Sequence, residues 1–260
     1  MTVQETLSFL KGSVNATVPE DTVDTLKLGN PDMEVTGIVT CFIATPAVFR
    51  EAVRLGANLV ITHEPTFYEH HDAITWQAES EVYRRKLALA KESGVALWRF
   101  HDLSHSNRPD LIMTGMENAL GWSAFRDAQC PWLFHLPATT LRALAEGMKT
   151  ALDATSVRLV GRDDLPVRNV AFLMGGCPGE MQMEVLQRDV DVLIAGETCE
   201  WMVCEYVRDA EQLGIDLGMA VFGHRNTEEE GMRHVASWVG GLLAGVPVTF
   251  VPSGDPFRSL

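Results

Sequence analysis

Short apolar runs alternate with amphipathic stretches along the first half of the chain, which is typical of an α/β protein. The pattern predicts buried strands at 35–44, 58–62 and 95–100. Helices are predicted between them, at 46–55 and 74–92. Polar residues come directly after the second and third of these strands, at a point where binding residues are often found.

The same alternation starts again in the second half of the chain, after a loop-rich region at 107–129 that contains one short helix at 116–121. The last helix carries Thr227 at its start and Glu230 three residues later, the spacing of a capping box. The strands predicted in this half are 157–160, 169–174, 191–195, 219–223 and 246–251, and the helices are 140–152, 179–188, 198–212 and 227–239.

The two halves resemble each other in the order of their elements. GIVTCFIATPAVFREAVRLGANLVITHE and NVAFLMGGCPGEMQMEVLQRDVDVLIAGE both predict a strand, a turn, a helix, a strand and then a glutamate. We interpret the chain as one domain, 1–260, made of two pseudo-repeated lobes at 1–125 and 126–260, each with a mixed sheet flanked by helices. Because this order of elements is common, two halves of independent origin would also explain the pattern.

Histidine and glutamate residues gather where the predicted strands end. Four of the eight histidines of the chain lie at such positions. Ligands of open α/β sheets bind beyond the carboxyl ends of the strands, so these residues are the candidates for a site. They are His63 and Glu64, His101 and His105, Glu197, and His224 and Glu228.

Imidazoles mixed with carboxylates are typical ligands of Zn, Fe, Mn, Ni or Co, whereas Ca and Mg prefer oxygen atoms alone. No cysteine stands at these positions, which excludes a structural zinc finger. Three histidines and two carboxylates exceed the needs of one ion but suit two ions that share a carboxylate and activate water for hydrolysis. One such histidine alone is better explained as a helix cap or a buried residue, but His63, His105, His224 and Glu228 together favour metal binding.

Charge and composition narrow the possible partners. The formal net charge of −14 works against binding to nucleic acid or to an anionic membrane surface. No apolar run approaches the roughly 20 residues that a membrane span needs, and the first residues do not resemble a secretory signal. The five cysteines are scattered and odd in number, so we expect reduced thiols and a cytoplasmic protein.

The chain resembles the NIF-three-like dinuclear-metal proteins, a family in which some members are named GTP cyclohydrolase type 2. Their strand and His-His-Pro motif is similar to ANLVITHEPTF, and their His-Thr-Asn-Leu-Asp stretch with its Gly-Val-Asn-Asp-Ala-Leu continuation is similar to WRFHDLSHS and GMENALG. Their Gly-rich turn, Asp-x-x-x-Thr-Gly-Asp strand and closing Gly-His-x-x-Ser-Glu resemble MGGCPGE, DVLIAGE and FGHRNTEEEG. The motifs occur in the family's order and cover most of the chain.

The resemblance implies which residues bind metal and where they lie. The ligands would be His63, Glu64, His105, His224 and Glu228, in a site between the two lobes, with His101 beside it as a residue that orients a ligand. The family usually has histidine at position 64 and aspartate at 105. The exchange is reciprocal, so three imidazoles and two carboxylates remain, and we expect two divalent transition-metal ions.

Two functions are compatible with this set. The first is a metal-dependent hydrolase, in which a metal-bound hydroxide attacks a small polar substrate such as GTP, another nucleotide or a phosphoester. The alternative is a non-catalytic metal-binding regulatory or scaffold protein that forms a ring-shaped oligomer. The resemblance implies a homohexamer in both cases. The turn at 175–179 is explained as a tight strand-to-helix connection or as an anion site, and it lacks the lysine of a P-loop.

Overall fold

The structure is a computed structural model that describes residues 1–17, 19–71 and 73–258. The chain forms two compact units. The first contains Met1–Gly115 and Gly231–Gly254, and the second contains Met116–Glu230 and the residues that follow Gly254. Each unit has a five-stranded mixed sheet flanked by helices, which confirms the predicted fold class.

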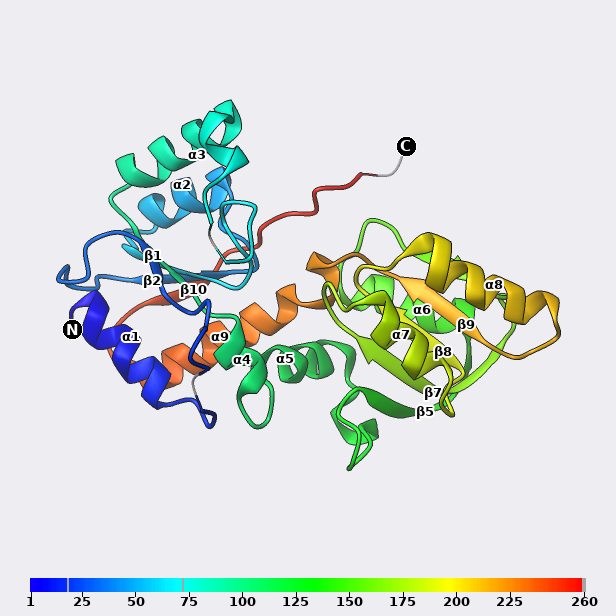
Figure 1. Ribbon diagram of the computed structural model, residues 1–260. Coiled ribbons are helices and arrows are strands. Elements are labelled where there is room, and N and C mark those ends of the chain that lie inside the picture. The colour runs from blue at the N-terminus through cyan, green and yellow to red at the C-terminus, as the bar shows by residue number, and fades with distance from the viewer. Residues whose placement is uncertain (18, 72, 259–260) are drawn as a thin grey trace. The chain divides into compact units, whose positions relative to one another are not determined.

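The sheet of the first unit has the order β1-β4-β3-β2-β10 (Figure 1). Four of its strands are parallel, and β1 pairs with β4 in the antiparallel direction. The central strands β2, β3 and β4 are buried along their whole length, as the continuous apolar runs predict. The strands are β1 (Leu26–Leu28), β2 (Ile38–Cys41), β3 (Leu59–Thr62), β4 (Ala96–Arg99) and β10 (Val248–Phe250).

Helices cover both faces of this first sheet. In Figure 1, α2 and α3 lie on one face and α1 and α9 on the other. Val39 and Leu97 pack with Phe49 of α2 in the core on the first face. On the opposite face, Phe100 stacks on Trp238 of α9 at a centroid distance of 5.9 Å. The helices that lie wholly or partly in the first unit are α1 (Val3–Gly12), α2 (Pro46–Arg54), α3 (Glu81–Glu92), α4 (Asp102–Ser106), α5 (Leu111–Leu120) and α9 (Glu229–Leu242).

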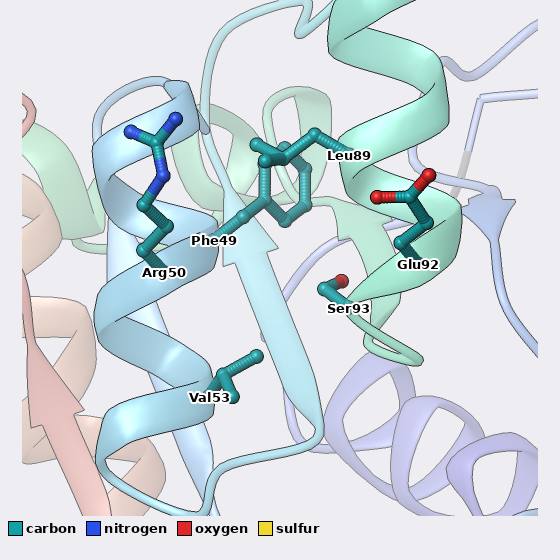
Figure 2. A pocket seen from close by; sticks show the side chains of 6 residues that line it. All are labelled: Phe49, Arg50, Val53, Leu89, Glu92 and Ser93. Carbon is teal, nitrogen blue, oxygen red and sulfur yellow. The ribbon is translucent and has the colours of Figure 1, made fainter.

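A shallow open groove runs between α2 and α3, as Figure 2 shows. Phe49 and Leu89 form its apolar floor, and Arg50 and Glu92 project from opposite sides. The other residues that line it are Val53 and Ser93. None of the predicted metal ligands lines this groove.

The second unit repeats the central pattern of three parallel strands, in the order β5-β7-β8-β9-β6. The outer strands β5 and β6 are antiparallel to their neighbours. Residues of α7 and α8 form the core with one face of β7, β8 and β9. The elements are β5 (Leu133–Thr140), α6 (Leu141–Ala151), β6 (Arg158–Val160), β7 (Pro166–Leu173), α7 (Gly179–Leu186), β8 (Val192–Ala195), α8 (Glu205–Gln212) and β9 (Gly218–Val221).

Several predicted elements have different limits in the structure. The helix predicted at 74–92 is split into a 3₁₀ helix at Trp76–Glu79 and α3, because Ser80 accepts a hydrogen bond from the Tyr83 amide and starts a new helix. The helix predicted at 198–212 is a π-helix at Glu200–Cys204 followed by α8.

The last helix begins two residues after its predicted start at 227. It starts at Glu229, because Thr227 belongs to a preceding 3₁₀ turn at Arg225–Thr227. The lobes at 1–125 and 126–260 stay a prediction. The two compact units have other bounds than these lobes, since residues 231–254 fold with the first unit and β10 completes its sheet.

The sequence predicts no segment that is long and apolar enough to span a membrane. Among the helices of residues 1–17, 19–71 and 73–258, none is long and apolar enough to cross a bilayer. The cytoplasmic location and the exclusion of nucleic-acid partners stay predictions.

Candidate metal centre

Three histidine rings gather at the carboxyl ends of β3 and β4 in the first unit. His63 follows β3, His101 follows β4, and His105 lies one turn further along α4. The ring centroid of His63 is 4.7 Å from that of His101 and 4.9 Å from that of His105. Each of the three offers a possible ligand atom, and these atoms all lie within 4.8 Å of one another. The adjacent parallel strands therefore bring together side chains that are about 40 residues apart in sequence.

Each of these three rings has an oxygen acceptor at Nδ1. The acceptors are the Phe100 carbonyl for His63 at 3.2 Å, Asp102 for His101 at 2.9 Å, and Asp110 for His105 at 3.1 Å. Carbonyl and carboxylate oxygens only accept, so Nδ1 carries the hydrogen and the lone pair of the neutral ring lies on Nε2. Metal-binding histidines are oriented by this kind of second hydrogen bond. The donor set therefore fits a transition-metal ion.

His101 is held from two directions. Its side chain donates to Asp102, and its backbone amide donates to Asp24 at 2.7 Å. Asp24 is completely buried and also accepts from the amides of Asp102 and Leu103, at 3.0 and 2.8 Å. Burial raises the pKa of the Asp24 carboxyl above its ordinary value. Three amides at the start of α4 thus share one carboxylate that the sequence analysis did not identify.

The surroundings of His101 keep its ring neutral. Burial, together with the neighbouring His63, lowers its pKa to about 4. Near neutral pH the ring therefore carries no proton at Nε2 and can act as a ligand.

Glu64 lies beside a buried arginine. Arg99 has only 1% of its side chain exposed, and its Nη2 is 3.9 Å from Glu64 Oε2. The same guanidinium donates from Nε to the His63 carbonyl at 3.1 Å. On its other side, Glu64 Oε1 is 3.5 Å from His101 Nε2. Glu64 therefore stands between a permanent cation and the histidine group.

In the second unit, His224 lies between two carboxylates. It follows β9, and its Nδ1 is 2.9 Å from Glu197, which comes after β8. Its Nε2 is 3.0 Å from Glu228, one turn further along the chain. A proton or a metal ion between Nε2 and Glu228 would satisfy both groups. Since Glu197 orients the ring through Nδ1, the arrangement repeats that of the first unit.

The turn after β7 packs directly against this pair. Gly175 has a φ of +62°, and a Cβ atom there would lie 2.1 Å from Glu228 Oε1 and 2.9 Å from His224 Nε2. The Gly175 amide donates to Thr227 at 3.0 Å. The residues 175–179 therefore form a strand-to-helix turn whose first glycine permits close approach to two predicted ligands.

Gln182 joins the two loops of the second unit. It is completely buried, and its amide nitrogen donates to the Cys177 carbonyl at 2.8 Å and to the Glu197 carbonyl at 2.9 Å. This residue anchors the loop that carries Glu197, and no sequence pattern marked it.

The structure thus forms two groups of the predicted residues. His63, Glu64 and His105 lie together with His101 in the first unit. His224 and Glu228 lie together with Glu197 in the second. That all five predicted ligands bind the same pair of ions stays a prediction.

The chain is similar to proteins of one family over nearly its whole length. The model of the family Duf34/NIF3 (NGG1p interacting factor 3) matches residues 1–256. A "GTP cyclohydrolase 1 type 2 homolog" of Escherichia coli (strain K12) is 28% identical over 231 residues, which are 85% of this chain and 86% of that protein. A protein of the same name from Lactococcus lactis is 25% identical over 203 residues, 74% of this chain and 76% of the other.

A solved structure shares the fold. The Bacillus cereus protein related to NIF3 superimposes with a TM-score of 0.80 at 16% sequence identity, and the match covers 100% of this chain and 99% of that one.

Proposed function

Because the chain belongs to the Duf34/NIF3 family, we propose that it binds two divalent transition-metal ions, Zn, Fe, Mn, Ni or Co, and hydrolyses a small polar substrate. The proposed ligands are His63, Glu64, His105, His224 and Glu228. One observation carries the proposal: the three histidines among them each have Nδ1 within 3.2 Å of an oxygen acceptor, which directs Nε2 toward an ion.

Two ions at such a site would supply Lewis-acid activation of water for a hydrolytic attack. The residues of the chain have supporting roles. Glu197 orients His224, and Asp110 orients His105. The names of the two relatives suggest a nucleotide such as GTP as the substrate, and a phosphoester would suit the same chemistry.

We expect the purified protein to carry up to two transition-metal ions per chain and to hydrolyse a member of a nucleotide and phosphoester panel. His224→Ala should lower metal content and abolish turnover, because it removes the ligand between two carboxylates. Elemental analysis and product detection by chromatography measure both. His135→Ala is the control, since His135 is an exposed residue of the edge strand β5 and its ring is hydrogen-bonded to Asp127 and Asn169.

Two results would decide between the alternatives. Absence of stoichiometric metal after reconstitution would contradict the proposal entirely. Bound metal without turnover on any substrate of the panel would favour the non-catalytic binding protein.

We also expect a homo-oligomer, with the hexamer implied by the family resemblance as the specific form. Analytical ultracentrifugation at micromolar concentration should give a mass about six times the 28.7 kDa of the chain. A species near 28.7 kDa would contradict the prediction.

A further inference from the structure

We propose that His101 is itself a metal ligand, so that His63, His101 and His105 form a three-imidazole site for an ion such as Zn²⁺ or Co²⁺. The inference rests on the proposed function for the presence of a metal. It goes beyond that function by adding a ligand and by naming the class of ion that the first unit selects.

His101 is arranged like the two proposed ligands His63 and His105, and not like a residue that only supports a ligand. Its ring is stacked on His63 at 26° with centroids 4.7 Å apart, and it meets His105 edge-on at 5.1 Å. The possible ligand atoms of the three rings lie within 4.8 Å of one another. A residue that only orients a ligand would donate a hydrogen bond to it. The Nδ1 of His101 instead lies 2.9 Å from Asp102.

The opposite ring nitrogen of His101 points to a carboxylate without forming a good hydrogen bond. The distance from His101 Nε2 to Glu64 Oε1 is 3.5 Å, beyond the usual range for an N–H···O bond. Because the ring hydrogen on Nδ1 is donated to Asp102, Nε2 presents its lone pair toward this carboxylate. A lone pair that faces a carboxylate is favourable when a cation lies near both. Arg99 lies 3.9 Å from the same carboxylate.

The fold holds His101 rigidly in this orientation. The Asp24 carboxylate accepts hydrogen bonds from three backbone amides at the start of α4. The Asp102 carboxylate accepts hydrogen bonds from the Thr22 hydroxyl at 2.9 Å and from the Val23 amide at 3.0 Å. The segment 22–24 and the start of α4 thus bind each other through two carboxylates. Such support is expected of a ligand, whose position must be kept within a fraction of an ångström.

Three imidazoles also predict which ions bind. Imidazole suits Zn, Cu, Fe and Ni, whereas carboxylate-rich sites suit Mn and Mg, and Co²⁺ binds more tightly than Mn²⁺ in the general order of affinity. We therefore expect this site to prefer Zn²⁺ or Co²⁺ to Mn²⁺.

The test is proton NMR of the whole protein loaded with Co²⁺, which is paramagnetic. A histidine bound to Co²⁺ through Nε2 shows a strongly shifted Nδ1–H signal that disappears in D₂O, so such signals count ligands. The wild-type protein should show four, from His63, His101, His105 and His224. His101→Gln should remove one signal and weaken Co²⁺ binding by about 100-fold or more. The matched control, His135→Gln, changes a histidine that also has a carboxylate partner and should leave all four.

Three shifted exchangeable signals in the wild-type protein, or an unchanged number in folded His101→Gln, would show that His101 is not a ligand. The wild-type count decides the question even if the variant does not fold. Failure of the proposed function looks different, because the wild-type protein would then show no shifted signals at all. Preference for Mn²⁺ over Zn²⁺ in competition titrations would also contradict the three-imidazole site.

Discussion

Gly175→Ala is expected to weaken metal binding about 100-fold and to lower the free energy of unfolding by only about 1–2 kcal/mol. The new methyl group would lie 2.1 Å from Glu228 Oε1 and 2.9 Å from His224 Nε2. Both atoms are at the ends of side chains, so rotation relieves the contact but displaces two proposed ligands. The small loss of stability comes from placing alanine at a φ of +62°. Calorimetric metal titration and denaturant unfolding measure the two effects separately.

The control for this variant is Gly147→Ala. Gly147 lies in the interior of α6, and a Cβ atom there would meet nothing within 4 Å. This change should stabilise the protein by about 1 kcal/mol and leave metal binding unchanged. Unaltered metal affinity in Gly175→Ala would show that His224 and Glu228 do not bind the ion in the arrangement proposed.

The central strands and the residues after them could be predicted from the sequence because these strands are buried on both faces. β3 and β8 are apolar and fully buried, so the chain shows a continuous run that ends abruptly at a polar residue. His63 and Glu197 mark those ends. The edge strands carry no such signal: β1 is only partly buried, and β5 alternates irregularly around Pro137. Their positions depend on pairing with β4 and β7, which a local pattern does not contain.

The first helix was missed although its signal is present. Thr2 accepts from the Glu5 amide and Glu5 accepts from the Thr2 amide, a complete capping box in front of an amphipathic stretch. The helix α4 is different. Its five residues are too few for a periodic pattern, and its start is stabilised by Asp24, which lies 77 residues before His101.

The ligand types could be predicted from the sequence, but their supporting residues could not. Histidine after a strand is visible in the chain, whereas Asp110, Arg99 and Gln182 act through contacts made only after folding. The role of His101 shows the same limit. The sequence places it near the site, and only the ring distances show that it lies as close to His63 as His105 does.

The second large effect concerns the exchange of residue types at positions 64 and 105, where the family usually has histidine and aspartate. We expect Glu64→His and His105→Asp each to reduce metal occupancy, because each changes the balance of imidazole and carboxylate by one ligand. The double variant restores the original numbers of imidazole and carboxylate ligands. Its metal occupancy should therefore exceed the value expected from adding the two single losses, as for residues that share a partner. Elemental analysis after reconstitution of all four proteins gives the comparison.

Folded stability should not recover in the same way. Glu64→His removes a carboxylate 3.9 Å from Arg99, which is 1% exposed, and should lower the free energy of unfolding by about 2 kcal/mol. In the wild-type protein Asp110 lies 3.1 Å from the His105 ring. His105→Asp would therefore place two carboxylates close together, and their repulsion should lower the free energy of unfolding. The two stability losses thus have separate causes, and the double variant should stay less stable than the wild type even where its metal occupancy recovers. Glu51→Gln, which breaks an exposed pair with Arg54, is the control and should change neither quantity measurably. If the metal losses add, the two positions act independently, and the reciprocal exchange at 64 and 105 is not a compensation at one metal centre.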